Sequence, residues 1–333
     1  MSGHSGGEVL LVPDCGVGAG LGHLERTLAL ADVLAASVSC RVAVPHGNLQ
    51  VRDRVAARGH TPVEAFGGVA QRALALCDAL RPDAVVLDAY GVGAEHQRGL
   101  RRLTCLVVVD DLAADCDCDL AVNPSAGGEA LRPQGATDFL GGAAYAPLSS
   151  AYSEARKTRD APGAVDARTV LLSTGATSLG GLGARVAETL LADDASLHVL
   201  AVAGPDAGAQ APRTGDRLDV LAAPPTLAPA MRRATVYAGA AGTTALQAAS
   251  VGVPMVVVAA VDNQAAQAAV LAEAGCALRV DAEEMAATVV RLLDDAPLRG
   301  EMARRGRSLV DGRGAERVAE AVIALAARGR ARA

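Results

Sequence analysis

Short apolar runs alternate with segments of helical periodicity along the first half of the chain. Residues 8–13 (EVLLVP) predict a buried strand, which is followed by a glycine turn and a helix from about residue 24. The apolar positions of that helix fall on one face: Leu24, Leu28, Ala31 and Leu34. Strands alternating with helices indicate a parallel, doubly wound sheet. Further strands are predicted at 40–45, 83–90, 104–112 and 119–127.

The same pattern restarts after residues 150–168, a polar segment that contains Pro162 and Gly163 and is predicted to be a linker. Gly252 and Pro254 form a typical helix stop signal within the second half. We therefore expect two domains of the same α/β type, 1–150 and 151–333. The elements predicted in the second are strands at 169–183 (with a glycine turn), 198–204 and 217–223, a strand–turn–helix–strand unit at 234–260, and a long helix at about 314–328.

Composition narrows the possible classes of function. The 333 residues are 51% apolar and carry a net charge of −6, with no basic block before residues 328–332, which argues against a nucleic-acid-binding face. The seven cysteines favour a reducing cytoplasm over a disulfide framework. Cys116 and Cys118 lack a second pair at zinc spacing, and we expect no metal site. No signal peptide is recognised, and the apolar run near 253–261 is too short to span a membrane.

The first glycine turn, GAGLGHLERTLALADVL (18–34), does not match a dinucleotide fingerprint. A G-x-G-x-x-G motif begun at Gly16 or Gly18 would need its last glycine where Leu21 or His23 stands, and no Walker lysine follows. What remains is a histidine at the start of a helix, at the sheet edge where ligands bind. His23 there is either a general base, because the helix N-terminus disfavours imidazolium, or a residue that caps or packs beside the turn.

Two further polar groups follow strands in the second half. AGAAGTTALQ (238–247) places Thr243 and Thr244 at a helix start, which suits a diphosphate or an ordinary N-cap. Asp262, Asn263 and Gln264 follow the next strand, where a turn would also explain them.

Carboxylates end two strands of the first half. Asp88 and Tyr90 stand two residues apart and are expected to share a face. Asp110 and Asp111 end the following strand, and Asp110 is either a site residue or a cap for the next segment.

Seven motifs in sequence order carry a resemblance to a known family. They are G-x-G-H-x-x-R (Gly20 to Arg26), D-x-Y-G (Asp88 to Gly91), V-D-D-L (109–112), D-L-x-x-N (Asp119 to Asn123), A-G-x-x-G-T-T with G-x-P (238–244 and 252–254), D-N-Q (262–264) and D-G-x-G-A-x-R-V (311–318). This set resembles the UDP-sugar hydrolases of pseudaminic acid synthesis and the related spore-coat polysaccharide proteins. It is more distantly similar to the UDP-GlcNAc transferase of peptidoglycan synthesis.

The resemblance implies a GT-B fold with two Rossmann-like domains across a cleft, no metal or other cofactor, and a last helix that crosses back to the first domain. It implies that His23 is catalytic and that the second domain binds the nucleotide. Gln247 stands where the family has a ribose-binding glutamate, and the family's G-G-S-D is Gly175-Ala176-Thr177-Ser178 here. The substrate-binding residues implied are Gly20, Gly22, Arg26, Asp88, Tyr90, Asp110, Asn123, Asp262, Asn263 and Gln264; the nucleotide-binding residues are Gly175, Thr177, Gly239, Gly242, Thr243, Thr244 and Gln247.

Three functions are compatible with these residues. The leading hypothesis is a nucleotide-sugar hydrolase that cleaves the anomeric C–O bond and releases the nucleoside diphosphate. The second is an inverting glycosyltransferase that passes the sugar to a small soluble acceptor, since no basic amphipathic helix for a lipid-linked acceptor is present. The third is a non-catalytic nucleotide-sugar-binding protein, against which His23 argues.

Overall fold

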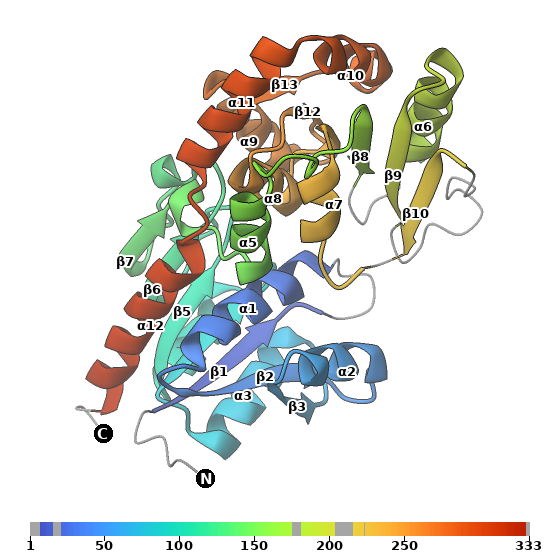
Figure 1. The fold of residues 1–333 in the computed structure, drawn as a ribbon. Coiled ribbons are helices and arrows are strands. Elements are labelled where there is room, and N and C mark those ends of the chain that lie inside the picture. The colour runs from blue at the N-terminus through green and yellow to red at the C-terminus, as the bar shows by residue number, and fades with distance from the viewer. Residues whose placement is uncertain (1–6, 16–20, 175–180, 204–215, 223, 331–333) are drawn as a thin grey trace. The chain divides into compact units, whose positions relative to one another are not determined.

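The computed structural model describes residues 7–15, 21–174, 181–203, 216–222 and 224–330, without the side chains of residues 21, 262 and 263. The chain forms two compact units, residues 1–149 with 313–333 and residues 150–312 (Figure 1). No helix among the described residues is long and apolar enough to cross a membrane.

The first unit is built on a seven-stranded sheet in the order β3-β2-β1-β4-β5-β6-β7, in which every pair of neighbours is parallel. Its strands are β1 (Glu8–Pro13), β2 (Ser39–Pro45), β3 (Thr61–Ala65), β4 (Ala84–Asp88), β5 (Cys105–Val109), β6 (Cys118–Asn123) and β7 (Ala136–Gly141). Its helices are α1 (Leu21–Leu34), α2 (Leu49–Ala57), α3 (Val69–Leu80), α4 (Ala94–Arg101) and α12 (Gly314–Arg330), with 3-10 turns at Gly128–Ala130 and Ala143–Tyr145.

Alternating side chains of β1 supply both faces of this sheet. Val9 and Leu11 belong to the core beneath α1, α2 and α12, whereas Leu10 and Val12 belong to the core beneath α3 and α4. A strand that is covered on both faces has a continuous apolar sequence. This apolar run is why β1 could be predicted from the sequence. The strand order reverses between β1 and β4, and the carboxyl ends there are the usual ligand site of such a sheet.

The second unit has a six-stranded parallel sheet in the order β10-β9-β8-β11-β12-β13. Its strands are β8 (Thr169–Ser173), β9 (His198–Ala203), β10 (Leu218–Ala222), β11 (Val236–Ala240), β12 (Met255–Val258) and β13 (Ala277–Arg279). Its helices are α5 (Ser150–Thr158), α6 (Leu182–Asp193), α7 (Ala228–Arg233), α8 (Thr243–Val251), α9 (Asp262–Glu273), α10 (Met285–Asp294) and α11 (Ala296–Leu309), with a 3-10 turn at Ala282–Glu284. The prediction of two doubly wound α/β domains is confirmed.

The linker and several edge strands differ from the sequence expectation. The predicted linker contains helix α5, in which Tyr152 and Ala155 are buried one turn apart while the other positions, apart from Ala151, are polar. The edge strands β3, β7 and β13 were not predicted. No residue of β3 or β7 is buried, and β13 is only three residues long. Their composition therefore lacks the apolar run that marks a central strand.

Candidate functional site

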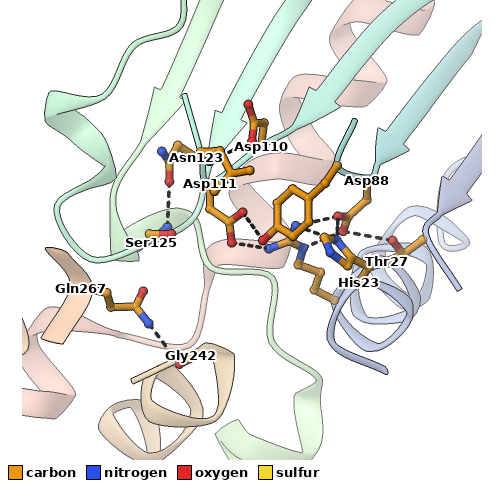
Figure 2. A network of polar contacts seen from close by, with 12 residues as sticks. His23, Thr27, Asp88, Asp110, Asp111, Asn123, Ser125, Gly242 and Gln267 are labelled. Carbon is orange, nitrogen blue, oxygen red and sulfur yellow. Dashed lines mark hydrogen bonds and ion pairs between the residues drawn. The ribbon is translucent and has the colours of Figure 1, made fainter. Parts of the chain in front are cut away.

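A buried polar cluster lies at the carboxyl edge of the first sheet, where β4 ends and α1 begins (Figure 2). Nδ1 of His23 is 2.6 Å from Oδ1 of Asp88, the last residue of β4. Arg26, one turn further along α1, donates from Nε to Oδ2 of Asp88 at 2.7 Å and from Nη2 to Oδ1 at 2.6 Å. The i, i+3 spacing on α1 therefore directs both side chains to one carboxylate.

The Asp88 carboxylate is ionised in this environment. Burial by itself would raise the pKa of Asp88, but the charge of Arg26 and the hydrogen bonds of His23 and Arg26 outweigh it and hold the pKa below its ordinary value. Thr27 adds a hydrogen bond from Oγ1 to Oδ2 at 3.3 Å. An ionised carboxylate only accepts, so we assign the proton of His23 to Nδ1 and the lone pair to Nε2.

Tyr90 and Asp111 complete the cluster from the loops that follow β4 and β5. The Tyr90 hydroxyl donates to Oδ1 of Asp111 at 2.5 Å, and Arg26 Nη1 donates to Oδ2 of Asp111 at 3.3 Å. The rings of His23 and Tyr90 meet edge to face with centroids 4.6 Å apart. Burial, and then the neighbouring Asp111 charge, raise the pKa of Tyr90, so its hydroxyl remains protonated.

The neighbouring carboxylate, Asp110, makes other contacts. Its two oxygens accept from the amides of Leu112 and Ala114, which is the capping arrangement that the sequence left open. Asp111, which the sequence did not single out among site residues, joins the polar network instead (Figure 2). Thr27 was also not anticipated, because nothing in a threonine on a helix face distinguishes it from a packed residue.

Asn123 lies at the end of β6 and is fully buried. Its Oδ1 accepts from the Ser125 amide at 3.1 Å (Figure 2), while its Nδ2 has no hydrogen-bond partner within the described part of the chain. Gly22 is the second residue of α1 and is exposed. Gly20 lies outside the described residues.

The second predicted group lies at the start of α8 in the other unit. Thr243 and Thr244 are its first two residues and are half-buried, and Gly242 is its N-cap. Gln247 is half-buried one turn further on. The first amides of a helix have no partner within the helix and attract anions. The arrangement is therefore chemically suited to a diphosphate.

Gln267 of α9, which the sequence analysis missed, holds the turn before α8. Its Nε2 donates to the carbonyl of Ala241 at 2.6 Å. It also donates to the carbonyl of Gly242 at 3.0 Å (Figure 2). Three residues earlier, Gln264 accepts from the Ala260 amide through Oε1. The spacing of the two glutamines on one helix face is the signal that could have identified Gln267.

Gly239 lies inside β11 rather than in the turn. A Cβ at this position would stand 1.8 Å from the Ser173 carbonyl oxygen, so strand packing, rather than the approach of a ligand, explains this glycine.

Asp262 and Asn263 are the first two residues of α9. Gly175 and Thr177 lie outside the described residues. No group of three metal-ligating side chains occurs among the residues that the structure describes.

Two parallel, doubly wound units in one chain define a Rossmann-like α/β protein of the GT-B fold class. No protein-family model matches the sequence, and no curated protein matches it. Among solved structures, the glycotransferase of kitacinnamycin has a TM-score of 0.68 at 17% identity, over 96% of this chain and 99% of that chain.

Two further structures extend this likeness. For MurG of Acinetobacter baumannii the TM-score is 0.63 at 17% identity, over 95% and 98% of the two chains. For UGT89C1 of Arabidopsis thaliana complexed with UDP, the TM-score is 0.65 at 12% identity, over 96% of this chain and 99% of that chain. Similarity at these identities establishes the fold. It gives no support to the hydrolase family that the sequence motifs suggested.

Proposed function

We propose that this protein is a glycosyltransferase that passes a sugar from a nucleoside diphosphate to a hydroxyl or amine of a soluble acceptor. The observation that carries the proposal is the pairing of His23 with a buried, ionised Asp88 at the carboxyl edge of the first sheet. A histidine fixed in this way presents a basic Nε2 and can stabilise the imidazolium that forms when a proton is taken up. The fold shared with known glycosyltransferases supports the same class.

In the proposed reaction, Nε2 of His23 takes the proton of the acceptor as its oxygen or nitrogen attacks the anomeric carbon. The bond from that carbon to the bridging oxygen breaks, and the nucleoside diphosphate leaves with both bond electrons. Attack opposite the leaving group inverts the anomeric configuration. Asp88 remains ionised and stabilises the imidazolium through Nδ1–H. Arg26 holds the carboxylate in place, while Tyr90 and Asp111 line the same cluster.

We assign nucleotide binding to the start of α8, where Gly242, Thr243 and Thr244 supply amides and hydroxyls for the diphosphate and Gln247 is available for the ribose. UDP is the first nucleotide to test, because the motifs resemble proteins that act on UDP-sugars and one structural neighbour is complexed with it. Gln267 would support this site by fixing the carbonyls of the preceding turn.

Hydrolysis of the same donor is the second candidate, favoured by the motifs of the first unit that resemble UDP-sugar hydrolases. The His23–Asp88 pair could activate water as well as an acceptor. The third possibility, binding without catalysis, does not account for the buried carboxylate–histidine pair.

Nucleotide release from a panel of nucleotide sugars, with and without candidate acceptors, separates these functions. A transferase shows slow release in water and a large rate gain with its acceptor, and the product has the inverted configuration. Fast acceptor-free release with ¹⁸O from water at the anomeric hydroxyl, and none in the nucleotide, would assign hydrolysis. Absence of turnover with every donor, combined with tight nucleotide binding, would refute both enzymatic proposals.

A further inference from the structure

A groove of about 520 Å³ lies in the second unit, away from the start of α8. Thr235 and Pro254, which line it, directly precede β11 and β12 and therefore mark the amino ends of these strands. Gly242, by contrast, follows the carboxyl end of β11. Because that strand has five residues, at a rise of roughly 3.3 Å each, the groove and the proposed nucleotide site lie at opposite edges of the sheet.

Four arginines line this groove, and Asp160 is its only carboxylate among the lining residues. Arg159 follows α5, and the others come from α11: Arg299, Arg304 and Arg307. Asp160 forms an ion pair with Arg307, which donates to it from Nη1 at 2.7 Å and from Nη2 at 3.0 Å. Arg304 pairs with Glu301 of the same helix, so the lining charge that remains is that of Arg159 and Arg299.

Carbonyls at helix ends satisfy only part of these guanidinium groups. Nη1 of Arg159 donates to the carbonyls of Met231 and Arg232 at the end of α7, and Nη1 of Arg299 donates to those of Leu292 and Leu293 in α10. Within the ranges that the structure describes, Nε and Nη2 of Arg159 and Arg299 have no acceptor. Burial and the nearby charge of Arg307 lower the pKa of Arg159 to about 10, as expected where like charges are gathered.

Gly300 is the second feature of the groove that points to a ligand. It stands within α11, where glycine costs about 1 kcal/mol relative to alanine, yet a Cβ there would meet nothing within 4 Å. Packing inside the chain therefore does not require this glycine. Ala296 and Ala303 lie one turn before and after it on the same lined face. Small residues between arginines leave room for a group to approach the helix backbone.

We propose that this groove is a binding site for a small phosphate-bearing ligand, held by Arg159 and Arg299. Guanidinium groups bind phosphate oxygens through paired, charge-assisted hydrogen bonds, and a dianionic phosphate matches the excess of positive charge. The volume of the groove is within the range that holds a phosphorylated metabolite. The site is independent of the proposed transferase reaction.

Binding of inorganic phosphate to the full chain, measured by calorimetry in a low-salt chloride buffer, tests this proposal. Arg299→Gln and Gly300→Glu should each weaken phosphate at least about tenfold, the first by removing donors and the second by placing a carboxylate in the groove. Arg305→Gln is the matched control, because Arg305 lies on α11, pairs with Glu301 and does not line the groove. It should change the affinity less than about twofold.

Thermal unfolding with and without phosphate provides the second measurement, since a ligand that binds the folded state raises its stability. Phosphate should raise the Tm of wild type and of Arg305→Gln, and should not raise that of Gly300→Glu. The proposal is overturned if wild type binds no phosphate at millimolar concentrations, or if the groove variants retain wild-type affinity. Equal losses in Arg305→Gln and Arg299→Gln would also overturn it, because they would show a general effect of charge.

Discussion

Nδ1 of His23 lies 2.6 Å from Oδ1 of Asp88, although 65 positions separate the two residues in the chain. The contact joins the first turn of α1 to the last residue of β4, two elements that meet because β1 and β4 are neighbouring parallel strands. Its effect is to fix the ring and the tautomer of a histidine whose side chain is 12% exposed.

Replacing His23 by Asn should lower kcat by about 10²–10⁴-fold with little change in nucleotide binding, because the variant lacks the basic Nε2 but keeps a polar side chain. Asp88→Asn should also lower kcat, since it favours the other tautomer. The control is His60→Asn, which removes a histidine that pairs with Asp32 at 2.7 Å elsewhere in the same unit. Near-normal turnover of His23→Asn, measured with the acceptor present, would show that His23 only packs beside the turn and is not catalytic.

Arg26→Met should destabilise the first unit by about 3–5 kcal/mol at neutral pH, because it leaves the Asp88 carboxylate buried without its counter-ion. In wild type the pKa of Asp88 is lowered, so its ionised form contributes stability above the ordinary value of 3.8, and the contribution is lost as the pH falls through the lower folded value. In the variant, burial is no longer opposed by Arg26, so the pKa of Asp88 rises and the protonated form is favoured.

The difference in free energy of unfolding between wild type and Arg26→Met should therefore shrink as the pH is lowered from neutral, as urea titrations at several pH values would measure. Arg58→Met, which breaks the more exposed pair with Asp32, should cost no more than about 1 kcal/mol. A loss in Arg26→Met that does not change with pH would contradict the role given to Asp88.

Asp111→Asn and Asp110→Asn should differ although the residues are adjacent. The first weakens the acceptor for the Tyr90 hydroxyl and for Arg26, so turnover should fall by about tenfold. The second affects only local backbone amides and should lower stability by about 1 kcal/mol with turnover retained. Steady-state kinetics and urea unfolding of both variants provide the comparison. A larger loss of turnover in Asp110→Asn would restore it as a substrate contact.

Gln247→Glu should tighten UDP, because a carboxylate forms a stronger hydrogen bond with ribose hydroxyls than an amide does. The gain should be at most about 1 kcal/mol, or roughly fivefold in Kd by calorimetry. Unchanged or weaker binding would show that the ribose lies elsewhere.

Gly239→Ala should unfold or severely destabilise the second unit, since its Cβ would stand 1.8 Å from the Ser173 carbonyl oxygen in the neighbouring strand. Gly183→Ala is the matched control. It lies in α6, its Cβ would come no closer than 3.7 Å to Thr174, and it should add up to about 1 kcal/mol of stability. Thermal unfolding of the two variants measures the contrast, and an unchanged Tm for Gly239→Ala would contradict the packing role.

The sequence by itself determined the elements whose signal is local. The apolar run of β1 predicted a strand covered on both faces, and Gly252, with φ of 83°, ends α8 as its stop signal predicted. It also singled out His23, Arg26, Asp88 and Tyr90, which the fold brings together. The edge strands β3 and β7 were missed because their exposed faces carry no apolar run.

Only the tertiary structure decided between neighbouring residues and assigned their partners. Asp110 and Asp111 are alike in sequence, yet one caps a loop and the other reaches Arg26 and Tyr90, because the chain turns between them at the end of β5. The same holds for Arg156 of α5 and for Arg159, which follows this helix. They donate to carbonyls 94 and 72 residues away. Such contacts depend on which strands become neighbours, and no local pattern of polar and apolar residues encodes that pairing.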